Sequence, residues 1–165
     1  MADLTTTNIG MTSEQTQAVA TILKRALADE FILYVKLHNY HWHVVGPQFE
    51  SLHAMFQTQY EEVAIFMDDI AERSLTIGAR TIGTLDEFSE FASLSEQPGE
   101  YPEAKVMVAN LLADHETIIR TLRQDLRDCD DKYNDMGTSD FLTGLMEKHE
   151  KHAWMLRAMM ADWKA

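Results

Sequence analysis

Cysteine, proline and glycine are scarce in this sequence of 165 residues, and each scarcity excludes a class of protein. The only cysteine, Cys129, has no partner for an intramolecular disulfide, which excludes a disulfide-built scaffold and favours the reducing cytoplasm. Three prolines and seven glycines leave long stretches without chain breaks, and these favour helices over many short strands. No apolar run reaches the roughly 18 residues of a membrane span, and residues 1–5 begin no signal peptide.

Basic residues are also few. Lysine and arginine number 14 against 27 aspartates and glutamates, which gives a formal net charge of −13. Binding to a nucleic-acid backbone relies on basic side chains that release condensed counterions, so we do not expect DNA binding over most of the surface. The first lysine is Lys24, and only residues 162–165 follow the last helical pattern, so we expect no lysine-rich tail that coats DNA. The acidic charge suits the attraction of small cations, and the alternative is that it only keeps the protein soluble. A gel-shift assay at low salt distinguishes a DNA-compacting protein from a cation-binding one.

Apolar residues recur at steps of three and four over four long stretches, which predicts an all-α protein. Residues 1–11 are polar and have no such period, so we expect a polar N-terminal arm followed by a single domain over residues 12–165. Thr12 and Gln15 have the spacing of a capping box, and this box predicts the start of a helix that continues to Val44.

Three further long helices and one short helix are predicted. The second long helix starts after a break at Gly46-Pro47, and residues 83–99 separate it from the third. A connection of this length can carry the chain back along a whole bundle. Four long helices with one crossover between the second and the third predict a ferritin-like four-helix bundle. The expected helix starts are Phe49, Thr84 for the short helix inside the crossover, Pro102, and a cap at Thr138.

Two histidines and two carboxylates form a candidate metal site. His41 and His53 lie on either side of the Gly46-Pro47 break, and Asp68 and Glu72 follow on the second helix. Imidazole and carboxylate groups together suit iron, manganese or zinc. His53 and Asp68 are about 22 Å apart along a continuous helix, because each residue rises about 1.5 Å. One chain therefore cannot bring both residues to one metal ion.

The two carboxylates are expected to point away from the core. Asp68 lies about 130° and Glu72 about 170° from the centre of the apolar stripe, and one turn separates them. Antiparallel pairing of two such helices about a two-fold axis would place His53 of one copy opposite Asp68 and Glu72 of the other. The alternatives are that the carboxylates form a solvated helix face and that His41 only stabilises a helix end. A di-iron centre inside one bundle would need Glu-x-x-His on two helices, and only Glu50 with His53 has that spacing.

The segments around these candidates resemble one family. They are Asn39-Tyr-His-Trp-His-Val-Val-Gly-Pro-Gln-Phe49, Leu52-His53, Met67-Asp-Asp-Ile-Ala-Glu-Arg73 and Lys151-His-Ala-Trp-Met-Leu156. Together they resemble the signature of the Dps family of mini-ferritins, and the resemblance covers about residues 13–164.

The resemblance implies a hollow homododecamer that oxidises Fe(II) at sites between two-fold-related subunits, typically with hydrogen peroxide. The ferric product would be stored as mineral inside the shell, which would protect against oxidative stress. By position, His41 and His53 match the histidine ligands of the family, whereas Asp68 and Glu72 match the carboxylates that the two-fold partner supplies. Trp42, next to His41, would either intercept a stray oxidising equivalent or pack at the subunit interface.

Gln57 departs from the pattern of the family, which usually has Asp or Glu four residues after the second histidine. A neutral amide is a weaker iron ligand than a carboxylate, so we expect one tightly bound iron per site and a weaker second. A third hypothesis is a shell that holds Zn or Mn at these positions without turnover. Ferric absorbance after addition of Fe(II) and peroxide would separate it from an oxidase.

The other histidines and an acidic segment are candidates for auxiliary roles. His115 lies on the apolar stripe of its helix and is expected to be a hydrogen-bonded core histidine, whereas His149 and His152, one turn apart, could bind a metal at the surface. His38 and His43 are either extra metal ligands or exposed polar residues near a helix end. The resemblance places the segment before the last long helix around three-fold pores of the shell, where acidic side chains could pass hydrated cations. The candidate pore residues are Asp131, Asp135 and Asp140.

Overall fold

The computed structural model describes residues 7–163, and all regular secondary structure within them is helical, as predicted. The four long helices are α1 (Ser13–His43), α2 (Phe49–Thr76), α4 (Ala104–Arg127) and α5 (Met136–Met160). The short helix α3 (Leu85–Phe91) lies in the crossover, a π-helical segment (Asp128–Lys132) precedes α5, and a 3-10 turn (Ala161–Trp163) follows it. Residues 1–6 of the predicted N-terminal arm lie outside the described residues, and residues 7–11 form no helix.

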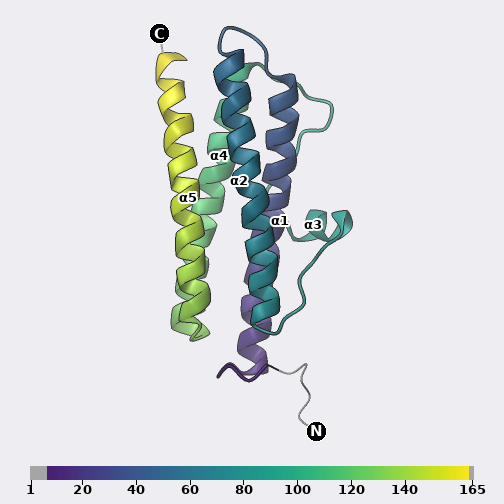
Figure 1. Ribbon diagram of the computed structural model, residues 1–165, viewed down its shortest axis with the longest axis vertical. Coiled ribbons are helices and arrows are strands. Elements are labelled where there is room, and N and C mark those ends of the chain that lie inside the picture. Colours follow the sequence, from purple (N-terminus) through teal and green to yellow (C-terminus); the bar gives the residue numbers. More distant parts are fainter. Residues whose placement is uncertain (1–6, 164–165) are drawn as a thin grey trace.

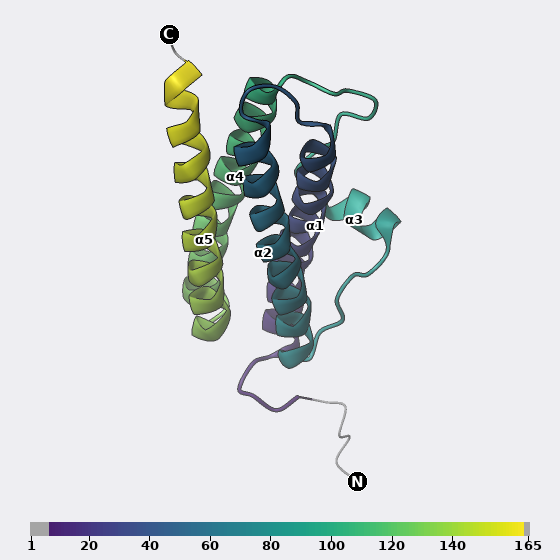
Figure 2. The same ribbon diagram turned by 45° about the horizontal axis from the view of Figure 1, so that its top comes forward.

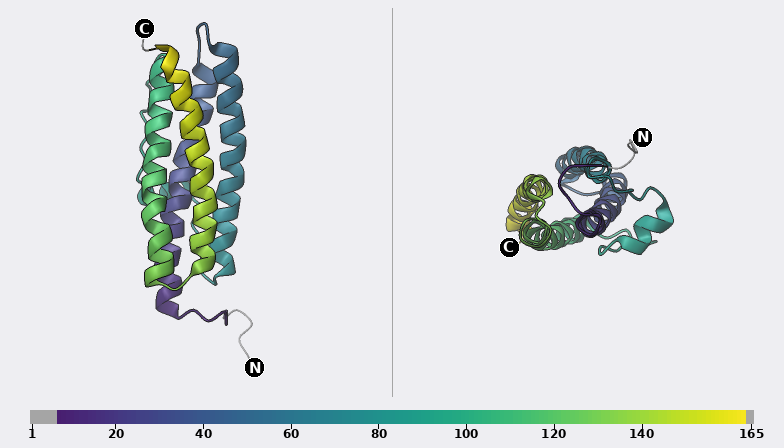
Figure 3. Two further views of the ribbon diagram at one scale, coloured as in Figure 1. Left: turned by 90° about the vertical axis from the view of Figure 1, so that its left-hand side faces the viewer. Right: turned by 90° about the horizontal axis from the view of Figure 1, so that it is seen from below.

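The four long helices form a bundle (Figure 1). Helix α1 lies beside α2, and α4 lies beside α5, with the two helices of each pair running in opposite directions. The end-on view in Figure 3 shows the four helices around a common axis, with α3 outside them. The segment between α2 and α4 runs along the outside of the bundle from one end to the other (Figure 2). This is the four-helix arrangement with one long crossover that the sequence predicts.

Two of the predicted helix starts are confirmed in detail. At α1, the Thr12 side chain accepts a hydrogen bond from the Gln15 backbone N–H, and the Gln15 side chain accepts one from the Thr12 backbone. Thr84 and Glu87 form the same capping box at α3. Each box satisfies backbone donors that the first helical turn leaves without partners.

The crossover is held against α1 by one buried carboxylate. Asp29 accepts hydrogen bonds from the Ser93 backbone N–H at 2.6 Å, the Ser93 hydroxyl at 2.7 Å and the Leu94 N–H at 2.9 Å. The Phe31 ring of α1 stacks on Phe88 of α3, with 4.2 Å between the ring centroids. These contacts fix a connection that has little secondary structure of its own.

Two other predicted helix starts are wrong. Helix α4 begins at Ala104 with Glu103 as its N-cap, so Pro102 lies outside the helix. Asp135 caps α5 in place of Thr138, because its carboxylate accepts from the Thr138 backbone N–H at 2.9 Å. A carboxylate that lies three residues before a free N–H satisfies that donor, and the Thr138 hydroxyl donates to the same carboxylate at 2.5 Å.

Candidate metal centre

The chain turn between α1 and α2 brings His41 and His53 together. Gly46 has a φ of 108°, a backbone conformation that favours glycine, and it lets the chain reverse within a few residues. The two imidazole rings stack with 3.7 Å between their centroids and 20° between their planes. His41 is buried and His53 is half-buried. We call this pair the histidine half-site.

Reciprocal hydrogen bonds fix the tautomers of the half-site. The Nδ1 atom of His41 lies 2.8 Å from the backbone oxygen of His53, and the Nδ1 atom of His53 lies 2.8 Å from the backbone oxygen of His41. A carbonyl oxygen only accepts hydrogen bonds, so both rings carry their proton on Nδ1. Both Nε2 atoms then keep a lone pair, which is the form of histidine that binds a metal ion.

Aromatic side chains surround the half-site. Phe49 stacks on His53 with 5.0 Å between centroids, and the edge of Tyr60 meets His41 at 5.3 Å. The His38 ring stacks on Tyr60, with 3.8 Å between the ring centroids. Burial, followed by the charge of His41, lowers the pKa of His38. Trp42 is 67% exposed and lies 5.2 Å from His38, so its indole ring faces outward.

Asp68 and Glu72 lie on the exposed face of α2, as predicted, one helical turn apart. Helix α2 is continuous from Phe49 to Thr76, which keeps Asp68 about 22 Å from His53 along the axis. Among residues 7–163, no group of three or more His, Cys, Asp or Glu side chains is arranged to hold a metal ion. One chain therefore presents two separate pairs of potential ligands, the histidine half-site and an exposed carboxylate pair.

The sequence over residues 20–165 matches the family described as ferritin-like domain. It is 50% identical over 153 residues to an uncharacterized low temperature-induced protein of Nostoc sp., covering 93% of this chain and 86% of that protein. It is 41% identical to DNA protection during starvation protein 2 of Bacillus anthracis, covering 86% of this chain and 96% of that protein. The solved structure of a Dps protein from Bacillus brevis is similar, with a TM-score of 0.85 and 39% identity over 91% of this chain and 99% of that one.

The chain belongs to the Dps mini-ferritins. Membership confirms the family resemblance of the sequence and the ferritin-like bundle. Ferritin-like proteins bind and store iron, and Dps proteins form oligomeric shells that protect cells under stress. Within residues 7–163, the helices of this mini-ferritin include none that is both long and apolar enough to cross a membrane.

Gln57, the departure from the Dps pattern, is exposed on α2 one turn after His53. Its amide nitrogen donates to Glu61 Oε1 at 2.8 Å. Sequence reasoning missed Glu61, although its spacing of four residues from Gln57 was a usable signal. The amide is thus already engaged with a neighbouring carboxylate and is a poor substitute for an anionic iron ligand.

The acidic segment before α5 separates into exposed and buried residues. Asp131 and Asp140 are exposed, as pore-lining residues would have to be. Asp135 is only 6% exposed, because it caps α5 and pairs with Arg73 at 3.1 Å. The pore prediction for Asp135 is therefore wrong, and its carboxylate stabilises the junction of α2 and α5 instead.

The remaining histidines differ in burial. His115 is fully buried and hydrogen-bonded to His149, as predicted for a core histidine, and burial, followed by the charges of His149 and His152, lowers its pKa well below the usual value. The prediction of a surface metal at His149 and His152 is wrong, because both side chains are buried. His43 is exposed, and its Nδ1 donates to the Asn39 carbonyl at 2.7 Å.

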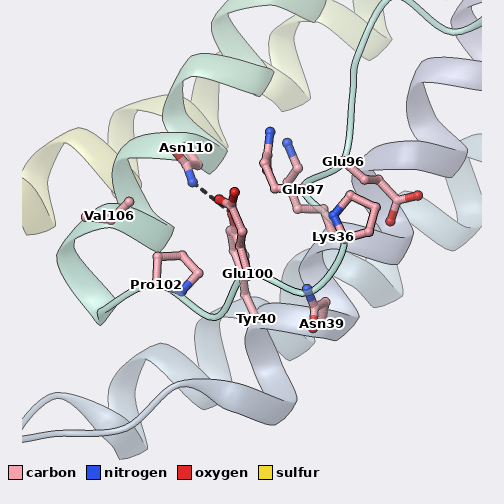
Figure 4. A pocket seen from close by; sticks show the side chains of 10 residues that line it. Lys36, Asn39, Tyr40, Glu96, Gln97, Glu100, Pro102, Val106 and Asn110 are labelled. Atoms are coloured by element: carbon pink, nitrogen blue, oxygen red, sulfur yellow. Dashed lines mark hydrogen bonds between the residues drawn. The ribbon is translucent and has the colours of Figure 1, made fainter.

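Tyr40 precedes His41 in sequence but lines a different feature, a polar cavity of about 250 Å³ (Figure 4). Asn110 donates to the Tyr40 hydroxyl at 2.9 Å, and Lys36, also on the wall, pairs with Asp114 at 2.7 Å. Burial raises the pKa of both Tyr40 and Asp114. No histidine lines this cavity, so it is not part of the half-site.

Proposed function

We propose that this mini-ferritin is a ferroxidase whose metal sites form between two-fold-related subunits. The observation that carries the proposal is the reciprocal bonding of His41 and His53, which leaves both Nε2 atoms free to bind a metal ion. Two neutral imidazoles alone do not stabilise Fe(III), which prefers anionic oxygen ligands. Asp68 and Glu72 of the same chain cannot complete the half-site, because Asp68 lies about 22 Å from His53 along α2 and Glu72 lies one turn farther, so the missing carboxylates must come from outside it.

A second copy of the chain supplies them most simply. If two α2 helices lie antiparallel across a two-fold axis, His41 and His53 of one chain meet Asp68 and Glu72 of the partner subunit. The symmetry then creates two identical sites per dimer. The exposure of both carboxylates supports this arrangement, because an interface can cover them without rearranging the bundle. Six such dimers would complete the twelve-subunit shell that the family resemblance implies.

The proposed reaction takes one electron from each of two Fe(II) ions. Hydrogen peroxide accepts both electrons, its O–O bond breaks, two protons are taken up, and two water molecules leave with two Fe(III) ions. The imidazoles bind Fe(II), and the carboxylates favour the Fe(III) product, which then joins the stored mineral. Because Gln57 replaces an acidic ligand, the site holds one iron tightly and a second weakly. Zn(II) or Mn(II) would occupy the same ligands without turnover.

Asp131 and Asp140 are the proposed entry residues for iron. Both are exposed at the junction between α4 and α5, and their hard oxygen donors suit hydrated divalent cations. A net charge of −13 adds to the attraction of cations towards the shell.

Co-expression of complementary variants tests whether two chains build one site. His53→Ala removes the histidine half, and the double variant Asp68→Asn/Glu72→Gln removes the carboxylate half. Each variant alone is expected to lose ferric absorbance after Fe(II) and peroxide are added. In a shell assembled from equal amounts of both, about a quarter of the sites are intact, because half of the dimers are mixed and each mixed dimer has one complete site.

Two results would contradict the proposal. Full activity in His53→Ala would exclude the half-site, and no recovered activity in mixed shells would exclude shared ligands. His43→Ala is the matched control, because His43 is exposed at the same helix end and lies outside the proposed site. Bound iron without ferric absorbance in the unmodified protein would instead favour a shell that holds metal without turnover.

The proposed protection works through iron and peroxide and does not require DNA. The name of the Bacillus anthracis relative refers to DNA protection, but the acidic charge of this chain opposes binding to phosphate backbones. Saturating retardation of DNA at low salt and modest protein concentration would overturn this part of the proposal. We place the protein in the cytoplasm, where an unpaired buried thiol such as Cys129 stays reduced.

A further inference from the structure

Three buried histidines form a cluster inside the bundle, well separated in sequence from the histidine half-site. His115 comes from α4, and His149 and His152 come from α5. The ring centroid of His115 lies 5.1 Å from that of His149 and 5.3 Å from that of His152. We call these three residues the histidine cluster. Nothing in the proposed ferroxidase reaction uses them.

A hydrogen-bonded chain sets the tautomers in the cluster. The Glu30 carboxylate of α1 accepts from Nε2 of His149 at 2.7 Å, so the Nδ1 atom of His149 has a lone pair. His115 Nδ1 lies 2.9 Å from that atom and must donate to it. The Nε2 atom of His115 therefore keeps a lone pair, and it is buried without a hydrogen-bond partner.

Further polar atoms without partners gather between α2 and α5. Both ring nitrogens of His152 and both amide atoms of Gln59 are buried and make no hydrogen bond. Nε2 of His152 lies 3.0 Å from Glu62 Oε2, but without hydrogen-bond geometry. Gln59, Glu62 and His152 all line a cavity of about 270 Å³ between the two helices. Buried polar atoms are almost always satisfied, so this many without partners points to a ligand.

We propose that the histidine cluster binds one divalent first-row transition-metal ion inside each bundle. The ligands are Nε2 of His115, one ring nitrogen of His152, and the carboxylate of Glu62, with the amide oxygen of Gln59 as the fourth donor. A set of two imidazole nitrogens and two oxygen donors suits Zn(II), Co(II) and Fe(II).

Glu30 and His149 are positioning residues in this proposal. A metal-binding histidine usually donates its second ring N–H to a carboxylate or another acceptor, which fixes the orientation of the ring. His149 donates to Glu30, and His115 donates to His149. Glu30 of α1 therefore fixes the ring of His149 on α5, which in turn fixes the ring of His115 on α4.

Side-chain rotation is needed before the donors meet, because the described residues contain no ready-made group of three metal-binding side chains. His152 can rotate, because its side chain borders the cavity and its one close polar contact, with Glu62 at 3.0 Å, is with another of the proposed ligands. Glu62 is partly exposed at the same cavity and can follow an incoming ion. The cavity between α2 and α5 thus provides a path from the surface.

The ligand set differs from that of a di-iron carboxylate centre in a bundle. Such a centre uses Glu-x-x-His on two helices, with several bridging carboxylates. Here α4 and α5 contribute His115 and His149 to the cluster, and Glu30 is hydrogen-bonded to His149. One ion held by two imidazole nitrogens and two oxygen donors follows from this composition.

Cobalt(II) binding tests the proposal, because its visible absorption reports the donor set without any turnover. The background is His53→Ala in the assembled protein, which weakens the half-site. We expect one Co(II) per chain after gel filtration, with an intense visible band typical of low coordination number. Adding His152→Ala or His115→Gln should weaken Co(II) binding by about ten-fold or more, and Glu30→Gln by about 10–100-fold.

His53→Ala with His43→Ala is the control and should keep both the band and the affinity. The proposal is overturned if His53→Ala binds no Co(II), or if the band and affinity survive His152→Ala. His152→Ala borders an existing cavity, so it tests the proposal even if His115→Gln fails to fold. As a second readout, Zn(II) should raise the Tm of the His53→Ala protein and leave the Tm of the His53→Ala/His152→Ala protein unchanged.

Discussion

His41 and His53 each donate a hydrogen bond from Nδ1 to the backbone oxygen of the other, at 2.8 Å in both directions. The two bonds tie the last turn of α1 to the first turns of α2. His53→Ala removes one bond and the stacked ring, so we expect the free energy of unfolding to fall by about 1–2 kcal/mol. Urea unfolding at fixed protein concentration measures the loss. His43→Ala should change the same quantity by less than about 0.5 kcal/mol.

Gln57→Asp should increase iron binding. A carboxylate at this position adds a hard anionic donor, so an anaerobic Fe(II) titration should show two tight irons per site, whereas we expect one in the unmodified protein. Loss of the Gln57–Glu61 hydrogen bond and like-charge repulsion should cost about 0.5 kcal/mol of stability. Gln57→Asn keeps a neutral amide and should leave the stoichiometry unchanged. Two tight irons in the unmodified protein would show that Gln57 does not limit the site.

Asp135→Ala and Asp140→Ala should differ sharply in stability, although both change an aspartate near the start of α5. Asp135 caps the helix and pairs with Arg73, so its loss should lower the free energy of unfolding by about 2–3 kcal/mol. Asp140 is exposed, so Asp140→Ala should change the free energy of unfolding by less than about 0.5 kcal/mol. Its loss should instead slow iron uptake in stopped-flow measurements if it lines the entry route. Equal destabilisation by both variants would contradict these assignments.

Asp29→Ala should loosen the crossover before it unfolds the bundle. The backbone N–H groups of Ser93 and Leu94 lose their buried acceptor, which should lower the free energy of unfolding by about 2–4 kcal/mol. Hydrogen exchange should accelerate first at these two amides. Glu90→Ala, an exposed change on α3, should leave their exchange unaffected.

Cys129 should resist alkylation in the folded protein. Burial, followed by the negative charges of Asp135, Asp125 and Asp128, raises the pKa of its thiol to about 12. The reactive thiolate is therefore almost absent at pH 8.5, and the side chain is fully buried. Mass spectrometry after iodoacetamide treatment should find no label until urea is added. Rapid labelling of the native protein would mean that the π-helical segment opens readily.

The periodicity of the sequence predicted the bundle because each long helix has one apolar stripe. The polar residues on those stripes were harder to assign to the core or to the surface. Leu145, His149, His152 and Leu156 follow one another at steps of three and four, so the spacing already placed both histidines in the core. Their chemistry left a surface metal open as a possibility, and their burial excludes it. Glu30 likewise lies on the apolar stripe of α1, three residues after Leu27 and three before Leu33, and it is buried.

The caps and partners of polar side chains were predicted less well than the helices. Asp135 and Thr138 are both good N-cap residues, and only the three-dimensional position of Arg73 explains why Asp135 is used. The bonding of Asp29 to Ser93 joins residues 64 positions apart, which no local pattern encodes. The outward placement of Asp68 and Glu72, by contrast, followed from helix geometry alone, because α2 is one continuous helix.

Helix α2 carries His53 near one end and Asp68 with Glu72 near the other, on one continuous rod from Phe49 to Thr76. In the proposed dimer, two such rods share both sites, so a shift of one rod along the other changes the ligand spacing at both sites together. An iron ion bound at the first site would hold the register that the second site needs. The two sites of a dimer should therefore fill cooperatively, with a Hill coefficient above one that disappears when a mixed dimer has only one complete site.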